Sequence, residues 1–457
     1  MSWRATLALA AALAAWASPA SAEAQVSPGQ AQALGREAYR YGIPLLEFLR
    51  IRREMTSVHA PDGRGNAPVN VLANARAFAR PNDRTVVAPN HDTLYSLAQL
   101  DLGKGPIVLS HPDMGRRYFD FEFVDPYTNV IGYVGTRTTG THAGRFQIAW
   151  TKKPGRRIGG VPVIRSKYRR VWMIGRTLAT DAAADQRRAH AKMRRYLLSP
   201  QPPLRSRRPG KARKHPLPTD GLALMDALGR ALAENPPPKR DRPLLKRLAQ
   251  VGVGPGLSPA EQGLPADVLQ ALGEGVEAEA AELLSRTRVD VLRQALGNGG
   301  WLTLSSRIGA YGTDYLLRAQ LALVGIGANT PAESVYPTAL ADSTGALLTG
   351  TNRYRLVFER RQLPPVRGFW SITMYDSDGF LVPDAAHRYS LGPTHPPLVR
   401  RGDGSIVIAI QQARPAEKDV NWLPAPAGGF RLSMRLYWPK ATVLRGVWQP
   451  PPLERLP

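Results

Sequence analysis

The chain has 457 residues, of which 43% are hydrophobic and 21% are charged, and its formal net charge is +25. This length exceeds that of one typical domain, and the composition is that of a folded globular protein, which excludes a single small module and a disordered chain. Because the chain contains no cysteine, disulfides, thiolate zinc sites, iron–sulfur clusters and a cysteine nucleophile are excluded as well.

The first residues have the pattern of a secretory signal peptide. Arg4 precedes an apolar run over residues 5–17, and small residues at positions 19–22 follow it. The run is shorter than the roughly 20 residues that cross a bilayer, and small side chains at its end are typical of a cleavage site. We therefore predict a signal peptide over residues 1–22, cleavage after Ala22, and a periplasmic or secreted protein. Because no later stretch approaches about 18 consecutive apolar residues, we expect no transmembrane segment after cleavage.

Most of the positive charge lies in one segment. Residues 152–214 contain 20 Lys or Arg and two acidic residues, Asp181 and Asp185. Such a segment can contact anionic envelope polymers or lipids, or it can be an ordinary solvated surface, and the sequence leaves both interpretations open. Nucleic acid is not an expected partner, because the protein is predicted to be exported and the segment lacks aromatic side chains interleaved for base stacking.

The predicted elements begin with a helix. Ser27 and Pro28 are a capping residue and a proline at the first helical position, so a helix starts here. Gly42 and Pro44 predict a break, after which a second helical segment covers residues 44–55.

The region that follows has the pattern of β-strands. Over residues 116–124, phenylalanines alternate with polar residues, which predicts a half-buried antiparallel strand with its polar side in solvent. Further short β runs separated by turn residues are typical of a β-sandwich. They cover residues 94–102, 130–135, 146–150 and 171–174.

Helical spacing returns from about residue 180 to residue 329, and alternation resumes over residues 354–437. We therefore predict a mainly β protein with a helical insert. N-terminal helices and a β-sandwich are expected over residues 23–178, a helical region with basic and proline-rich linkers over 179–329, and a second β-sandwich over 330–457.

Several ordered motifs resemble a known pair of families. Motifs in the first half resemble the exported bacterial family called domain of unknown function 1254, and motifs in the second half resemble its usual partner, domain of unknown function 1214. The first set is NHDTLYS at 90–96, DPYTN at 125–129 and GTRTTG at 135–140; the second is GIGAN at 325–329, LPPV at 363–366, GFWSITMYD at 368–376, RYS at 388–390 and NWLPAP at 421–426. The resemblance implies an N-terminal immunoglobulin-like sandwich, a helical connection and a C-terminal jelly-roll-like sandwich. It implies no catalytic residues.

Residues 90–95 combine an amide, an imidazole, a carboxylate, a hydroxyl and a phenol, which is more hydrogen-bonding capacity than a turn requires. We predict Asp92 as a catalytic residue and Asn90, Thr93 and Tyr95 as ligand-binding residues. The alternative is that Asn90 and Asp92 cap backbone N–H groups where the loop meets a strand. Their oxygen atoms also suit a hard divalent cation, but no further ligand motif lies nearby, so the sequence leaves metal binding open and indicates no cofactor.

A second polar set lies in the C-terminal region. Tyr375, Arg388 and Tyr389, with Trp422 nearby in the predicted domain, can hold a sugar or a carboxylated ligand through stacking and hydrogen bonds. We predict that the first three line one inter-domain pocket together with residues 90–95.

Alternation also assigns individual side chains to faces of strands. Asp120 and Glu122 share one face at about 6.7 Å, near the carboxylate separation of inverting glycosidases. The favoured alternative is an ion-pair ladder on a solvent-facing surface. Trp370 shares an apolar face with Ile372 and Met374, which predicts a core position.

Two functional hypotheses follow from these patterns. One is an exported hydrolase that uses Asp92 to act on a small glycan-like or lipid-like substrate in the inter-domain pocket. The other is a non-catalytic envelope protein that binds a glycan, a lipid or an anionic polymer, in the last case through residues 152–214. β-Sandwiches and jelly rolls carry both kinds of function.

Overall fold

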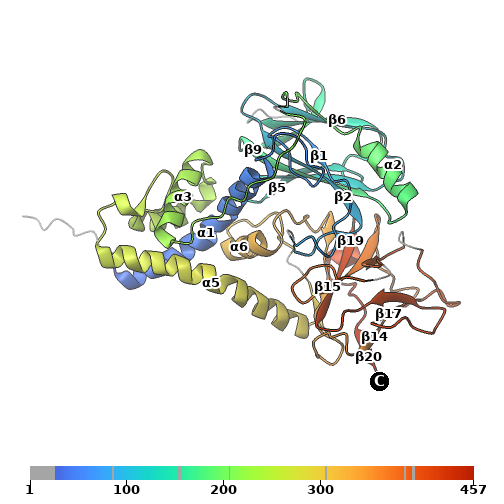
Figure 1. Ribbon diagram of the computed structural model, residues 1–457. Coiled ribbons are helices and arrows are strands. Elements are labelled where there is room, and N and C mark those ends of the chain that lie inside the picture. Colours follow the sequence, from blue (N-terminus) through green and yellow to red (C-terminus); the bar gives the residue numbers. More distant parts are fainter. Residues whose placement is uncertain are drawn as a thin grey trace, which may run out of the picture.

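The structure is a computed structural model. It describes residues 26–84, 87–151, 157–204, 206–303, 306–384, 387–393 and 397–457. The predicted signal peptide lies outside the described residues and stays a prediction. Among the described residues, no helix has the length and apolar character needed to cross a bilayer. Figure 1 shows a helical arm on one side of the molecule and two β regions, one above the other, on the other side.

The N-terminal β region consists of two five-stranded sheets packed face to face. The first sheet has the order β1 (Ala73–Asn74), β2 (Thr93–Asp101), β9 (Arg170–Leu178), β4 (Phe119–Val124) and β5 (Val130–Gly135). The second has the order β10 (Leu197–Ser199), β3 (Ile107–His111), β6 (Gly144–Trp150), β8 (Val161–Ser166) and β7 (Arg157–Ile158). Phe119, Phe121 and Phe123 lie in the core between the sheets, as their alternation predicts. Helix α2 (Ala183–Met193) adds Ala189 and Met193 to this core.

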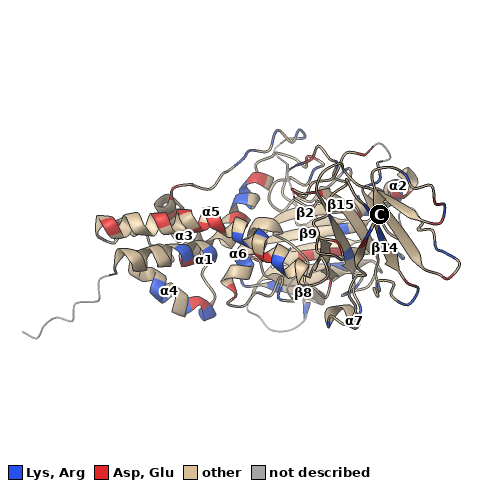
Figure 2. Cartoon of the chain, turned by 90° about the horizontal axis from the view of Figure 1, so that it is seen from below, with Lys and Arg blue, Asp and Glu red and all other residues tan. Residues whose placement is uncertain are grey.

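The helical arm is built from segments that precede and follow the N-terminal sandwich in the sequence. Helix α1 (Pro28–Met55) packs along α5 (Ala266–Leu296), and α3 (Gly221–Glu234), α4 (Arg242–Leu248) and α6 (Tyr315–Val324) complete the arm. Three short 3-10 turns connect these helices: η1 (Lys239–Asp241), η2 (Ala249–Val251) and η3 (Pro259–Glu261). Figure 2 shows acidic residues along α5 and basic residues on the helices beside it, and Glu279 of α5 indeed pairs with Arg36 and Arg40 of α1.

The start of α1 follows the predicted capping pattern, and its middle does not follow the predicted break. Ser27 accepts a hydrogen bond from the backbone of Gln30, whose side chain accepts one from the Ser27 backbone in return. The expected break at Gly42 and Pro44 is wrong, because α1 continues through Pro44 as one helix. Gly42 and Pro44 are both buried within the helical arm, so tertiary packing outweighs the local disadvantage of proline.

The C-terminal region contains two further sheets. One has the order β11 (Trp301–Leu302), β13 (Thr338–Ala339), β19 (Phe430–Tyr437), β15 (Trp370–Asp376) and β16 (Ser390–Leu391), with β12 (Ser334–Val335) also paired to β19. The other has the order β18 (Asn421–Pro424), β17 (Ile406–Gln411), β14 (Arg353–Phe358) and β20 (Leu453–Leu456), and α7 (Ala441–Leu444) precedes β20. Trp370, Ile372 and Met374 lie in the core, as alternation predicts.

The predicted fold class is thereby confirmed: the protein is mainly β, with sandwich-type sheets on both sides of a helical insert. Because α1 packs with the insert and not inside the sandwich, the helical arm is assembled from two separate stretches of chain. The predicted domain boundaries at residues 178 and 329 stay a prediction.

Candidate functional site

The polar segment at residues 90–95 lies between the two β regions. Both carboxylate oxygens of Asp92 accept hydrogen bonds from C-terminal hydroxyls, at 2.5 Å from Ser371 Oγ and 2.9 Å from Ser390 Oγ. Asn90 donates to the hydroxyl of Tyr437 at 2.6 Å. Its own carbonyl oxygen accepts from the backbone N–H groups of Asp92 and Thr93. Asn90 thus caps the start of β2, while Asp92 connects the two β regions.

Of the three predicted C-terminal ligand residues, Tyr389 contacts this segment and Tyr375 contacts the residue just before it. The hydroxyl of Tyr375 donates to the carbonyl oxygen of Pro89 at 2.7 Å, and the ring of Tyr389 packs edge-on against His91 with ring centres 5.0 Å apart. Arg388 does not join them. Its guanidinium donates to the backbone of Trp422 at 3.2 Å, beside a different cavity.

The remaining predicted residues are also placed. Thr93 is buried at the start of β2, and its hydroxyl has no hydrogen-bond partner among the described residues. Tyr95 is half-buried on β2, and its ring centre lies 5.8 Å from the guanidinium of Arg176. The catalytic and ligand-binding roles of all these residues stay predictions.

A buried ionic cluster lies next to the segment, where the sequence predicted a solvent-facing surface. That expectation is wrong for Asp120 and Glu122, whose exposed fractions are 1% and 0%. One guanidinium nitrogen of Arg176 lies 3.2 Å from Asp120, 3.0 Å from Glu122 and 2.8 Å from the amide oxygen of Asn329. The physical reason is that β4 lies inside the sheet, and the loop between α6 and β12, which carries Asn329, lies over its outer face.

The cluster extends into the C-terminal region through a third carboxylate. The hydroxyl of Tyr118 contacts Glu333 at 2.6 Å and Asp120 at 3.1 Å, and Arg137 pairs with Glu333 at 2.5 Å. Burial raises the pKa of Asp120 and that of Glu122, each to about 7, although the charge of Arg176 opposes the rise. Burial thus favours the neutral form of both carboxyls at the contact between the two β regions, and the Arg176 charge favours the ionised form.

Sequence reasoning missed the cations of this interface. Arg176 bonds the carboxylates above, and Arg435 donates to Thr373 at 2.9 Å and to the hydroxyl of Tyr375 at 2.6 Å. Alternation contained the signal for Arg435, because it lies on β19 opposite the core residues Met434 and Leu436. Nothing in the sequence paired these arginines with partners more than 50 positions away.

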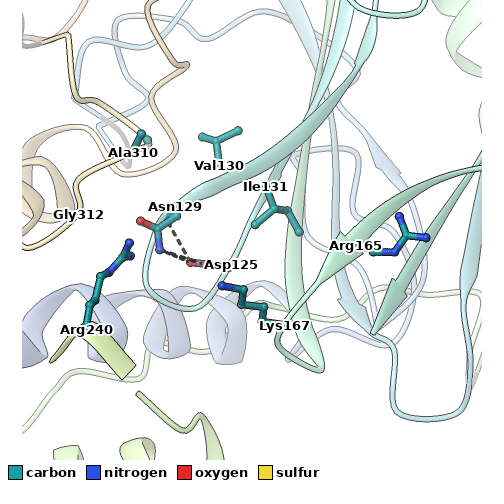
Figure 3. A pocket seen from close by; sticks show the side chains of 10 residues that line it. Asp125, Asn129, Val130, Ile131, Arg165, Lys167, Arg240, Ala310 and Gly312 are labelled. Carbon is teal, nitrogen blue, oxygen red and sulfur yellow. Dashed lines mark hydrogen bonds between the residues drawn. The ribbon is translucent and has the colours of Figure 1, made fainter. Parts of the chain in front are cut away.

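Two cavities lie apart from Asp92. The first, of about 420 Å³, lies between the N-terminal sandwich and the helical arm; its walls include Asp125, Lys167 and Arg240 (Figure 3). The second, of about 360 Å³, lies in the C-terminal region, where Arg388, Asn421 and Trp422 form part of its wall. Within the described ranges, no group of three or more His, Asp or Glu side chains is arranged to hold a metal ion.

Two family models match the chain. The model described as Protein of unknown function (DUF1254) matches residues 69–200, and the model described as Protein of unknown function (DUF1214) matches residues 333–441. The DUF1254 match thus lies N-terminal to the DUF1214 match, in the order that the motifs indicated. The resemblance that the motifs indicated is confirmed. Asp92, Asp120, Glu122 and Arg176 lie in the DUF1254 match, and Glu333 lies in the DUF1214 match, so the buried interface joins the two matched regions.

Two solved structures are similar to the chain, and the first of them supports the fold. The VPA0106 protein from Vibrio parahaemolyticus is similar with a TM-score of 0.67 and 22% identity, over 93% of this chain and 100% of that chain. A putative uncharacterized protein from Burkholderia cenocepacia is similar with a TM-score of 0.42 and 15% identity, over 94% of this chain and 97% of that chain. No curated protein matches the chain.

Proposed function

We propose that this DUF1254–DUF1214 protein is an exported, non-catalytic binding protein of the cell envelope, and that its ligand is a glycan bearing a carboxylate. One observation carries the proposal: Arg388, which the sequence singles out as a ligand-binding residue, borders a cavity of about 360 Å³ together with Trp422 and Asn421. Pockets of this size accommodate small ligands, and a guanidinium recognises a carboxylate through charge-assisted hydrogen bonds.

The composition of the wall supports this ligand class. Arg414 and Lys418 add positive charge, whereas the one carboxylate on the wall, Glu417, is already paired with Arg355 at 2.7 Å. Leu398, Val399 and Val420 supply apolar surface. This combination of cations, apolar side chains and a tryptophan suits a uronic acid. The hydrophobic face of its ring packs against the apolar side chains, and its carboxylate pairs with the cations.

The test is calorimetric titration of the mature chain with tri-galacturonate, with neutral maltotriose as the comparison ligand. We expect the uronate to bind and Arg388→Gln to weaken it at least about tenfold, because a lost charge-assisted contact is worth about 1.4 kcal/mol or more. Arg445→Gln, an exposed arginine of the same region outside the cavity, is the matched control. Equal affinity for maltotriose, or unchanged uronate affinity in Arg388→Gln, would contradict the proposal.

A hydrolase remains the second candidate, and the raised pKa of Asp120 and Glu122 supports it, because perturbed carboxyls gather at active sites. In that case Asp92 is the catalytic residue at the same interface. The expected result is release of reducing sugar from tri-galacturonate by the wild type and its loss in Asp92→Asn. If no reducing sugar is released at any pH from 5 to 8, the hydrolase hypothesis is contradicted and only the binding proposal stands.

A further inference from the structure

The cavity between the sandwich and the helical arm is built by four separate stretches of chain. The turn at residues 125–129 joins β4 to β5, and Arg165 and Lys167 lie at and just after the end of β8. Arg240 comes from η1, and residues 309–312 precede α6. Figure 3 shows Arg240 and Lys167 on two sides of the turn that carries Asp125. The volume of about 420 Å³ is in the range of small-molecule sites.

The polar groups of the wall are unequally satisfied. The ammonium of Lys167 has no hydrogen-bond or ion-pair partner among the described residues, and the described ion pair of Arg240 is a long one, 3.9 Å from Asp241. The carboxylate of Asp125, by contrast, accepts hydrogen bonds from the Asn129 side chain at 3.1 and 3.2 Å and from two backbone N–H groups at 2.9 Å. On this wall, Lys167 and Arg240 therefore have unused capacity for hydrogen bonds and ion pairs, whereas the Asp125 carboxylate does not.

A buried arginine adds positive charge directly behind the wall. Arg318 of α6 is 1% exposed and donates to the carbonyl oxygen of Gly312, a wall residue, at 2.8 Å. Its other two guanidinium nitrogens have no hydrogen-bond partner among the described residues, and no ion pair is described for it. The rings of Tyr311 and Tyr315, with centres 5.7 and 5.8 Å away, offer cation–π contact only.

An unpaired buried charge is costly, and a nearby opposite charge offsets that cost. Burial raises the pKa of Asp125, and the charge of Arg318 counteracts the rise, so the field of this guanidinium already reaches a residue of the cavity wall. An anion in the cavity would experience the same field.

We propose that this cavity binds a small molecule through an oxyanion group, a carboxylate or a phosphate, held by Lys167 and Arg240 with the charge of Arg318 behind it. The apolar side chains of Val130 and Ile131 face the remainder of such a ligand, since both also line the cavity. This site goes beyond the proposed glycan site, because it lies in a different cavity and shares no wall residue with it. It also gives one residue of the basic segment, Lys167, a specific role.

The experiment is titration of the mature chain with inorganic phosphate and, in a second arm, with succinate, at constant ionic strength set by sodium chloride. The two arms show which oxyanion is preferred. We expect saturable binding in at least one arm and a loss of affinity of about fivefold or more in Lys167→Gln and in Arg240→Gln, because each removes a charge-assisted contact worth about 1 kcal/mol.

The matched controls are Lys246→Gln and Arg242→Gln, two exposed cations of α4 outside the cavity. Both should bind phosphate or succinate as the wild type does, and so should Arg388→Gln, which tests the other cavity. The proposal is overturned if neither anion binds beyond the effect of chloride at equal ionic strength. It is overturned equally if the α4 variants lose as much affinity as the cavity variants, since binding would then follow net charge alone.

Discussion

Glu122 and Arg176 show how a single buried side chain acquires properties that its sequence context does not reveal. The alternation that correctly places the phenylalanines of β4 in the core also places Asp120 and Glu122 on the opposite face. It cannot say what covers that face. The cover comes from Asn329 and Glu333, about 200 positions later, so the direction of each side chain was predictable and its environment was not.

The buried carboxyls give a specific pH dependence. The pKa of Glu122 is about 7 in the folded protein and near 4.5 when unfolded, so between these values the folded state holds a proton that the unfolded state has lost. The free energy of unfolding should therefore fall as pH rises from about 4.5 to 7, by up to about 1.4 kcal/mol per pH unit for each such group. In Glu122→Gln this contribution disappears, and urea denaturation at pH 5 and pH 8 measures the difference.

Asp185→Asn is the control of opposite sign. Burial disfavours the Asp185 carboxylate, but hydrogen bonds from Arg117 and Thr180 outweigh burial and lower its pKa. Its stabilising effect is complete above the unfolded pKa and is lost only in acid, so Asp185→Asn should shift stability by the same amount at pH 5 and pH 8. A wild-type stability profile parallel to that of Glu122→Gln would contradict the prediction.

At the scale of elements, packing between helices decides what local sequence leaves open. Helix α1 crosses α5 so closely that a Cβ atom on Gly275 would lie 2.1 Å from the carbonyl oxygen of Gln32. Period and capping predicted the helix start at Ser27, because those signals are local. The continuation of α1 through Pro44 depends on packing inside the helical arm, which a single sequence does not show.

Gly275→Ala should therefore destabilise the protein by about 1–3 kcal/mol, because the helix backbones must move apart to admit the new methyl group. Gly273→Ala is a matched substitution two positions away on α5, where the new Cβ would meet Leu222 at an ordinary 3.5 Å. It should be neutral or stabilising by up to about 1 kcal/mol, since alanine favours a helix over glycine. Thermal or urea denaturation of the pair is the measurement, and equal effects would argue against the close crossing.

At the scale of the whole molecule, the contact between the DUF1254 and DUF1214 matches contains buried polar side chains. Asp92 bonds Ser371 and Ser390 across it, and Arg176 donates to the backbone of Gly327 at 2.8 Å as well as to the two carboxylates of β4. The sequence predicted that residues 90–95 and Tyr375 line one pocket. Tyr375 bonds Pro89, the residue just before this segment, and the shared pocket stays a prediction. It did not predict the buried ion pairs of Arg176 with Asp120 and Glu122 next to this segment.

The interface makes a prediction about cooperativity. Removing Arg176 leaves Asp120 and Glu122 buried without their shared cation and removes two bonds to the segment that leads into the C-terminal region. Loss of one partner from a buried pair costs about 3–5 kcal/mol. We expect the wild type to unfold in one calorimetric transition. In Arg176→Met the two β regions should unfold in separate transitions, the first at a lower temperature than that of the wild type.

Arg169→Met provides the comparison, because Arg169 lies just before β9 and is an exposed arginine whose ion pair with Asp101 is outside the buried cluster. Exposed pairs contribute about 0–1 kcal/mol, so this variant should keep the wild-type transition. If the two variants shift the transition equally, charge loss alone explains the effect and the interface does not couple the regions. If only Arg176→Met separates the transitions, the buried cluster is what makes the two β regions unfold together. Arg169→Met removes the same charge but leaves the contact between the two regions intact.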